Sequence, residues 1–159
     1  MKRKALMDLK LWLSSNLRKP LILRGARQVG KSTLVHLFAE QEKLDLFEFN
    51  FEIDQLHSIS NEQFEIQALL DEMQLKKQKR ITENSLIFFD EIQESPKLLK
   101  LLRYFYEKKP EIAVIAAGSM LEIALHVDDF SFPVGRVEFY HLGPMTFREF
   151  LWATGNDLV

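Results

Sequence analysis

Short apolar runs alternate with polar stretches along the whole chain. A short apolar run bounded by charged residues, glycine or proline is typical of a strand buried in a parallel sheet, and an aromatic-rich, partly alternating segment also favours a strand. The predicted strands lie at residues 21–23, 44–53, 86–89, 112–116 and 134–142. These runs are much shorter than a membrane-crossing helix, so the pattern predicts about five strands and no membrane association.

The segments between the runs carry apolar residues at helical spacing. In the N-terminal segment, the residues on one helical face are Leu6, Leu9, Leu13 and Leu17. Further helices are predicted from about Lys31, at residues 63–73, after Ser95 and Pro96 as far as residue 106, and at 119–126. Residues 74–84 are polar and are predicted to form a surface connection. Strands and helices thus alternate, which predicts an α/β fold in three layers, with a mostly parallel sheet between helices.

Composition and charge narrow the class further. The 159 residues predict one domain, and the net charge of −2 gives no general reason to expect nucleic-acid binding. The basic run at 76–80 reads better as part of the polar connection. The chain has no cysteine, and Asp8 and Lys10 interrupt what would have to be the apolar part of a signal peptide. A cytoplasmic location is therefore predicted.

The strongest chemical signal is GARQVGKS at residues 25–32, which matches the phosphate-binding loop GxxxxGK[ST] between a strand and a helix. In such a loop, backbone N–H groups and the start of the helix bind phosphate oxygens. The predicted ligand-binding residues are Gly25, Ala26, Arg27, Gln28, Val29, Gly30, Lys31, Ser32 and Thr33. Lys31 is expected to lie against the outer phosphates of ATP, and Ser32 to bind the accompanying Mg2+.

A second signal is LIFFDEIQ at residues 86–93, where an apolar strand runs directly into two carboxylates. At the carboxyl end of a parallel strand, Asp90 is expected to reach the Mg2+ shell, and Glu91 to act as the base that activates water. Ser119, in AAGSM, follows another strand; it either contacts the terminal phosphate or caps a helix. Arg136 either stabilises charge on the transferred phosphoryl group, within its own subunit or from a neighbour, or forms an exposed ion pair.

Taken together, GARQVGKST, LIFFDEIQ, LLRYFYEKKP, IAAGSM and SFPVGRVEFYHLGPMTFREFL resemble a bacterial and archaeal branch of the AAA+ ATPases, over nearly the whole chain. The resemblance implies Walker A at 25–32, Walker B at 86–91 and a first sensor at Ser119. It also implies that the Walker A strand lies between the sensor strand and the final strand, with the Walker B strand beyond the sensor strand. Relatives in this branch usually carry a helical lid and a C-terminal domain of unknown function, so residues 1–159 are expected to be the ATPase core of a longer protein.

Several functions remain open on the sequence. The leading hypothesis is Mg2+-dependent ATP hydrolysis that drives a conformational change in an attached or partner domain. The alternatives are an ATP-binding switch with little hydrolysis, a GTPase, or a kinase of the same phosphate-loop class. A base-reading NKxD motif is absent, which argues against a GTPase. Whether the chain forms a homo-oligomer is also open on the sequence. Any nucleic-acid processing would depend on the C-terminal region that such relatives carry.

Overall fold

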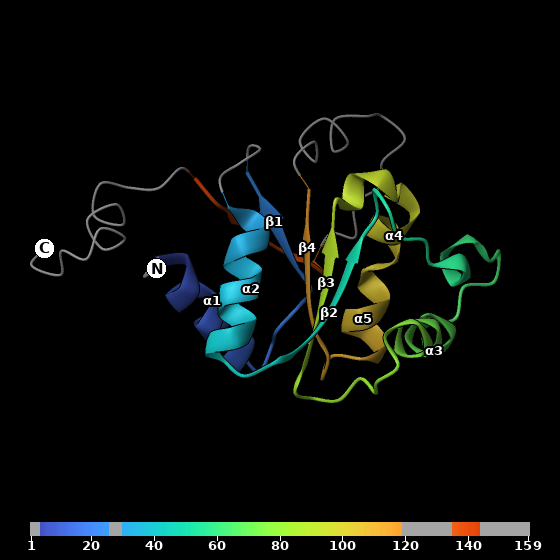
Figure 1. Ribbon diagram of the computed structural model, residues 1–159, viewed down its shortest axis with the longest axis horizontal. Coiled ribbons are helices and arrows are strands. Elements are labelled where there is room, and N and C mark those ends of the chain that lie inside the picture. The colour runs from blue at the N-terminus through green and yellow to red at the C-terminus, as the bar shows by residue number, and fades with distance from the viewer. Residues whose placement is uncertain (1–3, 26–29, 119–134, 144–159) are drawn as a thin grey trace, which may run out of the picture.

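The computed structural model describes residues 4–25, 30–118 and 135–143 (Figure 1). The helices are α1 (Lys4–Ser14), α2 (Lys31–Gln41), α3 (Ile66–Lys77), α4 (Pro96–Leu101) and α5 (Arg103–Lys108), with short 3-10 turns η1 (His57–Ser60) and η2 (Ile92–Glu94). The strands are β1 (Leu21–Arg24), β2 (Asp45–Asn50), β3 (Ser85–Asp90), β4 (Ala113–Ala117) and β5 (Glu138–His141). The predicted alternation of strands and helices is confirmed.

The five strands form one parallel sheet in the order β2-β3-β4-β1-β5. β1, which leads into the phosphate loop, therefore lies between β4 and β5, as the family resemblance implied. Leu21 pairs with Ile115 on one side and with Glu138 on the other. Because all strands run the same way, their carboxyl ends meet at one end of the sheet, which we call the carboxyl end, and their amino ends meet at the other, the amino end.

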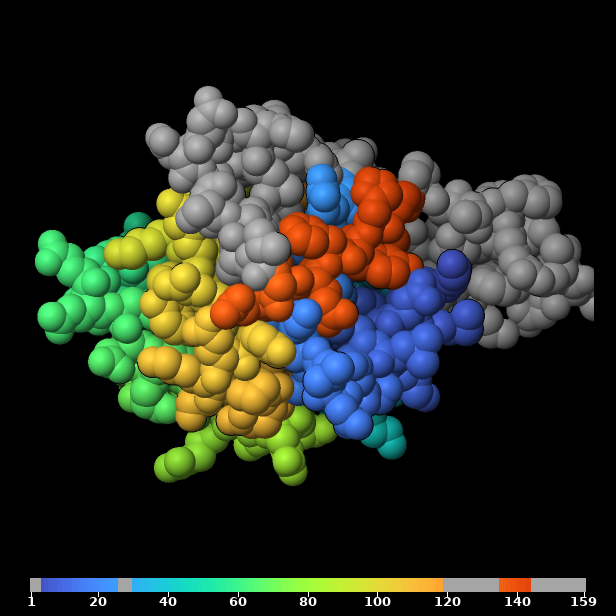
Figure 2. Space-filling view, turned by 180° about the vertical axis from the view of Figure 1, so that it is seen from behind, coloured from blue at the N-terminus to red at the C-terminus, as the bar shows by residue number. Residues whose placement is uncertain are grey.

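The two faces of the sheet are covered by different helices, which gives the three predicted layers. Successive side chains of a strand point to opposite faces. One core, under α3, α4 and α5, contains Phe47, Phe49, Ile87, Phe89 and Val114 among others. The other, under α1 and α2, contains Leu21, Leu23, Leu86, Phe88 and Ile115 among others. Seen from behind, residues 135–143 lie between the surface of α4 and α5 and that of the N-terminal segment (Figure 2).

Several helix boundaries differ from the prediction. α3 continues to Lys77, so residues 74–77 belong to the helix and not to the polar connection, because glutamine, leucine and lysine favour helix once a turn exists. The predicted helix after Pro96 is divided at Leu102 into α4 and α5. Ser95 occupies the N-cap position, but its side chain makes no capping hydrogen bond.

The N-terminal prediction holds for most of its length. Leu6 and Leu9 are buried, and Trp12 joins them in the core, whereas Leu17 lies beyond the end of α1 and is 76% exposed. The described part of the chain contains no helix with the length and apolar character that crossing a bilayer would require. The predicted helix at 119–126 lies outside the described residues.

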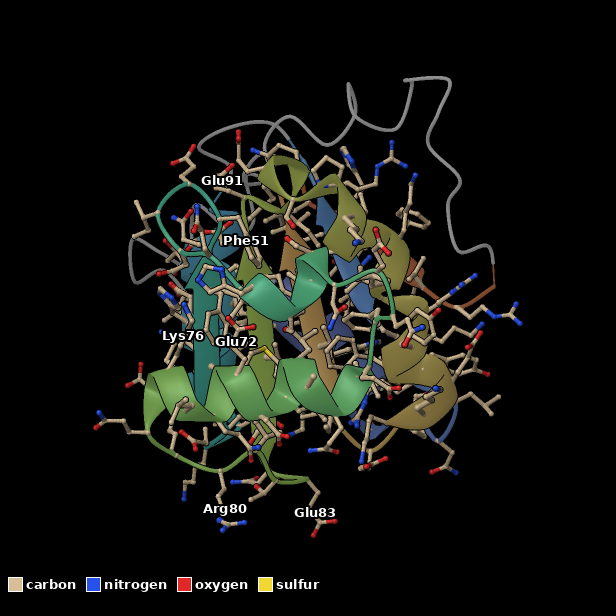
Figure 3. The ribbon with its side chains drawn as sticks, turned by 90° about the vertical axis from the view of Figure 1, so that its right-hand side faces the viewer. Phe51, Glu72, Lys76, Arg80, Glu83 and Glu91 are labelled. Carbon is tan, nitrogen blue, oxygen red and sulfur yellow. The ribbon has the colours of Figure 1, made fainter. Side chains whose placement is uncertain are left out.

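A carboxylate of α3 accepts several hydrogen bonds from the connection between β2 and α3. Glu72, on α3, accepts hydrogen bonds from the N–H groups of His57 (2.7 Å) and Ser58 (2.8 Å) and from the Ser58 hydroxyl (2.7 Å). Burial alone would raise the pKa of Glu72, but these hydrogen bonds lower it. Figure 3 shows Glu72 and Lys76 along the middle of this side of the molecule, with Glu91 near the carboxyl end.

Candidate functional site

The phosphate-loop segment has the expected strand–loop–helix arrangement. β1 ends at Arg24, Gly25 is buried, and α2 begins at Lys31. Gly30 has φ 90° and ψ 29°, a left-handed conformation that glycine adopts without a Cβ clash. Among the described residues, no side chain caps the N-terminus of α2. The start of a helix is where backbone N–H groups and the helix dipole favour an anion.

Lys31 is buried beside this helix start, with 9% of its surface exposed. Its Nζ donates a hydrogen bond to the carbonyl oxygen of Gly25 over 2.7 Å. Burial lowers the pKa of Lys31, and the carboxylates of Glu91 and Asp90 oppose that change. The ammonium group is thus held on the Gly25 carbonyl, near both acidic side chains.

Asp90 is the last residue of β3, and the strand extends one residue beyond the predicted 86–89 at each end. Its Oδ1 accepts a hydrogen bond from the N–H of Glu91 over 2.9 Å. Burial raises the pKa of Asp90; the neighbouring carboxylates of Glu91 and Glu48 add to this, while Lys31 and the Glu91 N–H act against it. Acidic groups therefore outnumber the compensating cation here, and a further cation would stabilise the ionised carboxyl.

Glu91 has a left-handed backbone, with φ 52° and ψ 45°. Lys43 and Gln78 share this conformation, but both lie just after a helix, where it is a usual way to end one. Glu91 instead joins a strand to η2, and the conformation costs a residue with a Cβ roughly 1–2 kcal/mol. Strain of this kind tends to persist where it directs a functional side chain.

The side chain of Gln93 contacts both Glu91 and the end of β4. Its Nε2 donates a hydrogen bond to Oε2 of Glu91 over 2.5 Å. Its Oε1 lies against Gly118, where an added Cβ would be only 2.1 Å away. Sequence reasoning missed this residue, although it closes the motif LIFFDEIQ, because its position depends on the turn at Glu91 and on a residue of another strand.

The structure describes only some of the remaining predicted site residues. Ser32 is half-buried in the first turn of α2, and Thr33 is exposed there. Ala26, Arg27, Gln28 and Val29 lie outside the described residues, as does Ser119. Because β4 is parallel to its neighbours β3 and β1, Gly118 lies at the carboxyl end of the sheet, so Ser119 follows a residue at the predicted edge. The contacts of Ser119 with phosphate stay a prediction.

Arg136 requires a correction. It precedes β5, and the N–H of Glu138 bonds to the carbonyl of Pro20, so Arg136 lies at the amino end of the sheet. At about 3.3 Å per strand residue, this places its backbone roughly 13 Å or more from Gly25. The exposed guanidinium pairs with Glu107, Nε to Oε1, over 2.9 Å. The structure therefore supports the ion-pair interpretation and does not bring Arg136 to the phosphate loop of its own chain.

A parallel sheet, a phosphate loop with a buried lysine, and an acidic pair at the end of a nearby strand define an α/β protein of the P-loop nucleotide-binding class. The family model for an AAA domain matches residues 17–151, and the chain belongs to this family. The fold is thus that of an AAA-type P-loop ATPase, which supports ATPase-type nucleotide binding.

Comparison with solved structures supports the same fold. A Walker-type ATPase of Pyrococcus abyssi matches with a TM-score of 0.59 and 19% sequence identity, over 99% of this chain and 60% of that protein. The chain therefore spans about 60% of the length of this relative. A search of curated proteins gave no match.

Proposed function

We propose that this chain binds ATP as its Mg2+ complex at the carboxyl end of the sheet and hydrolyses it. The observation that carries the proposal is the position of Lys31: a buried ammonium, held on the Gly25 carbonyl and close to Asp90 and Glu91. Burying a lysine beside a loop is costly unless its charge has a use, and the outer phosphates of ATP provide one.

The side chains present fit both ligands. The uncapped start of α2 offers N–H donors and a positive helix end to phosphate oxygens. The hydroxyl of Ser32 and the carboxylate of Asp90 are oxygen ligands of the kind that Mg2+ prefers, and the raised pKa of Asp90 is expected where a carboxylate lacks a full complement of cations. When bound, Mg2+ would draw charge from the phosphate oxygens.

The chain's own residues then divide the chemistry between them. Lys31 exchanges its contact with the Gly25 carbonyl for contacts with phosphate oxygens, where its charge is most stabilising as the bond between the terminal phosphorus and the bridging oxygen of ADP breaks. Glu91 orients a water molecule and accepts its proton as the oxygen attacks the terminal phosphorus. The products are ADP and inorganic phosphate. We further propose that this cycle drives a conformational change in an attached or partner domain.

The first test separates binding from hydrolysis. With Mg2+ and a non-hydrolysable ATP analogue at about 100 times its dissociation constant, ligand binding adds roughly 2.7 kcal/mol of stability, or about 5–10 °C in unfolding temperature. K31A should lose this shift. E91Q should keep it and lose ATP turnover by roughly 10²- to 10⁴-fold.

Two exposed residues provide matched controls. Lys97 also donates to a backbone carbonyl, that of Asn61, but is exposed, so K97A should keep the full shift. E94Q, in the same turn as Glu91, should keep turnover. A shift retained in K31A would contradict nucleotide binding at this loop. If the native chain binds the analogue but does not turn ATP over, the protein is an ATP-binding switch instead. Equal turnover in E91Q and the native chain would contradict the role of Glu91 as the base.

A further inference from the structure

The Gln93 side chain contacts Glu91, the residue after β3, and Gly118, the residue after β4, and the ATPase chemistry described above gives it no role. We propose that Gln93 is a positioning residue that orients the Glu91 carboxylate for water activation and makes that orientation depend on Gly118. The inference rests on the proposed ATPase function, and it concerns the same site.

The contact with Glu91 is directional. A carboxylate only accepts hydrogen bonds, so the end of the Gln93 amide that faces it is the NH2 group. This group holds Oε2 over 2.5 Å without adding a charge that would neutralise a base. A general base must be aimed at its water as well as ionised, and the hydrogen bond restricts rotation of the carboxylate.

The backbone between the two residues fixes the reach of this contact. Ile92 is fully buried, and the turn is closed by hydrogen bonds from the N–H of Glu94 to the Glu91 carbonyl (3.0 Å) and from the N–H of Ser95 to the Ile92 carbonyl (2.8 Å). Side chains two positions apart meet here because Glu91 adopts the left-handed conformation. The strained turn thus brings the amide and the carboxylate together.

The other end of the amide is fixed by β4. A Cβ on Gly118 would lie 2.1 Å from Oε1 and 3.3 Å from Cδ of Gln93, so the amide occupies the space that a side chain would take. Oε1 is buried and has no hydrogen-bond partner among the described residues. The amide is therefore held by packing on Gly118, and a shift of the β4 end would be passed to Glu91 through this one side chain.

The test uses steady-state ATP turnover and the binding of a non-hydrolysable analogue. Q93L keeps the bulk of the side chain and removes the donor; it should lower kcat roughly 10- to 100-fold and leave analogue affinity within about twofold. G118A should have a similar effect, because the new methyl group displaces the amide. In a Q93A background the space is empty, so G118A should add little further loss.

A matched control is Gln67, whose Nε2 donates to the Asp71 carboxylate over 2.9 Å on the exposed side of α3. Q67L should leave kcat unchanged. Unchanged kcat in Q93L, equal losses of kcat and analogue affinity, or additive losses for Q93A and G118A would each overturn the inference.

A second measurement does not depend on turnover. The carboxyl carbon resonance of Glu91, recorded without nucleotide, should shift in Q93L and in G118A but not in Q67L. If the native chain fails to hydrolyse ATP, the proposed function fails by the turnover assay, while this resonance still decides the contact: a shift supports it, and an unchanged resonance overturns it.

Discussion

Partly or fully buried cations have different surroundings at the two ends of the sheet, as a comparison of Arg18 and Lys31 shows. At the amino end, Arg18 donates to the carbonyls of Leu13 (2.8 Å), Glu111 (2.9 Å) and Pro110 (3.3 Å). At the carboxyl end, Lys31 has the carbonyl of Gly25 and two carboxylates nearby. Burial lowers the pKa of both groups.

The difference lies in what surrounds each cation. Arg18 ties the chain after α1 to the turn before β4, so its hydrogen bonds connect segments of the fold. Around Lys31, burial raises the pKa of Asp90, and Glu91 has a left-handed backbone. The hydrogen bonds of Arg18 are therefore expected to contribute to stability, whereas the groups around Lys31 are those that the proposed function assigns to ATP and Mg2+. Three predictions test this contrast.

The largest effect is expected at Arg18. R18M keeps most of the apolar stem and removes the donors, so three carbonyls lose a charged partner; the expected cost is about 1–2 kcal/mol, or roughly 3–6 °C in unfolding temperature. The shift produced by the ATP analogue should remain. R103M is the control, because Arg103 is exposed and contacts Tyr104 beside it. A loss of the nucleotide shift in R18M would break the division between the two ends.

An intermediate effect of opposite sign is expected at Asp90. In the folded chain the pKa of Asp90 is raised above its ordinary value of 3.8. Between the unfolded and the folded pKa, the folded chain therefore binds more protons than the unfolded chain, and its stability falls as pH rises through that window. The amide side chain in D90N does not titrate, and its oxygen can still accept the hydrogen bond from the Glu91 N–H.

Without nucleotide, D90N should therefore unfold at nearly the native temperature at low pH and at a higher temperature than the native chain at pH 7. It should also lose Mg2+-dependent analogue binding. Thermal unfolding across a pH series measures both. A lower unfolding temperature at pH 7 would mean that attraction to Lys31 outweighs the cost of burying the carboxylate.

The smallest effect is expected at Arg136. Its exposed ion pair with Glu107 should contribute less than about 0.5 kcal/mol, so R136A should scarcely change the unfolding temperature. Turnover should also be unchanged. The measurement is specific activity over a range of protein concentrations: a rise with concentration in the native chain that is absent in R136A would show that Arg136 acts on a neighbouring copy.

Much of the fold was predictable because its signals are local. Buried parallel strands give continuous apolar runs, and a phosphate loop must follow one strand and open one helix. These rules located β1, α2 and β3 and named Lys31, Asp90 and Glu91 as site residues. The strand order came from the family resemblance, since hydrophobic patterns do not specify which strands pair.

The errors concern residues whose position depends on distant parts of the chain. Arg136 follows a glycine within the segment 134–142 that was predicted as a strand, whereas β5 begins only at Glu138. Whether Arg136 reaches the phosphate loop of its own chain depends on which end of β5 it occupies, and it lies at the amino end. Gln93 has no periodicity or spacing that distinguishes it. Its contacts exist because β4 lies beside β3 and is followed by Gly118, which leaves room for the Gln93 amide.

The central place of β1 also has a consequence for synthesis of the chain. Leu21 pairs with Ile115 and Glu138, so β1 leaves the ribosome long before either partner strand exists. Until then, its apolar run has two unpaired edges, a situation that exposes nascent chains to misassociation. The strand on which the phosphate loop depends is thus made early and completed late, and chaperone binding during translation would be most useful in that interval.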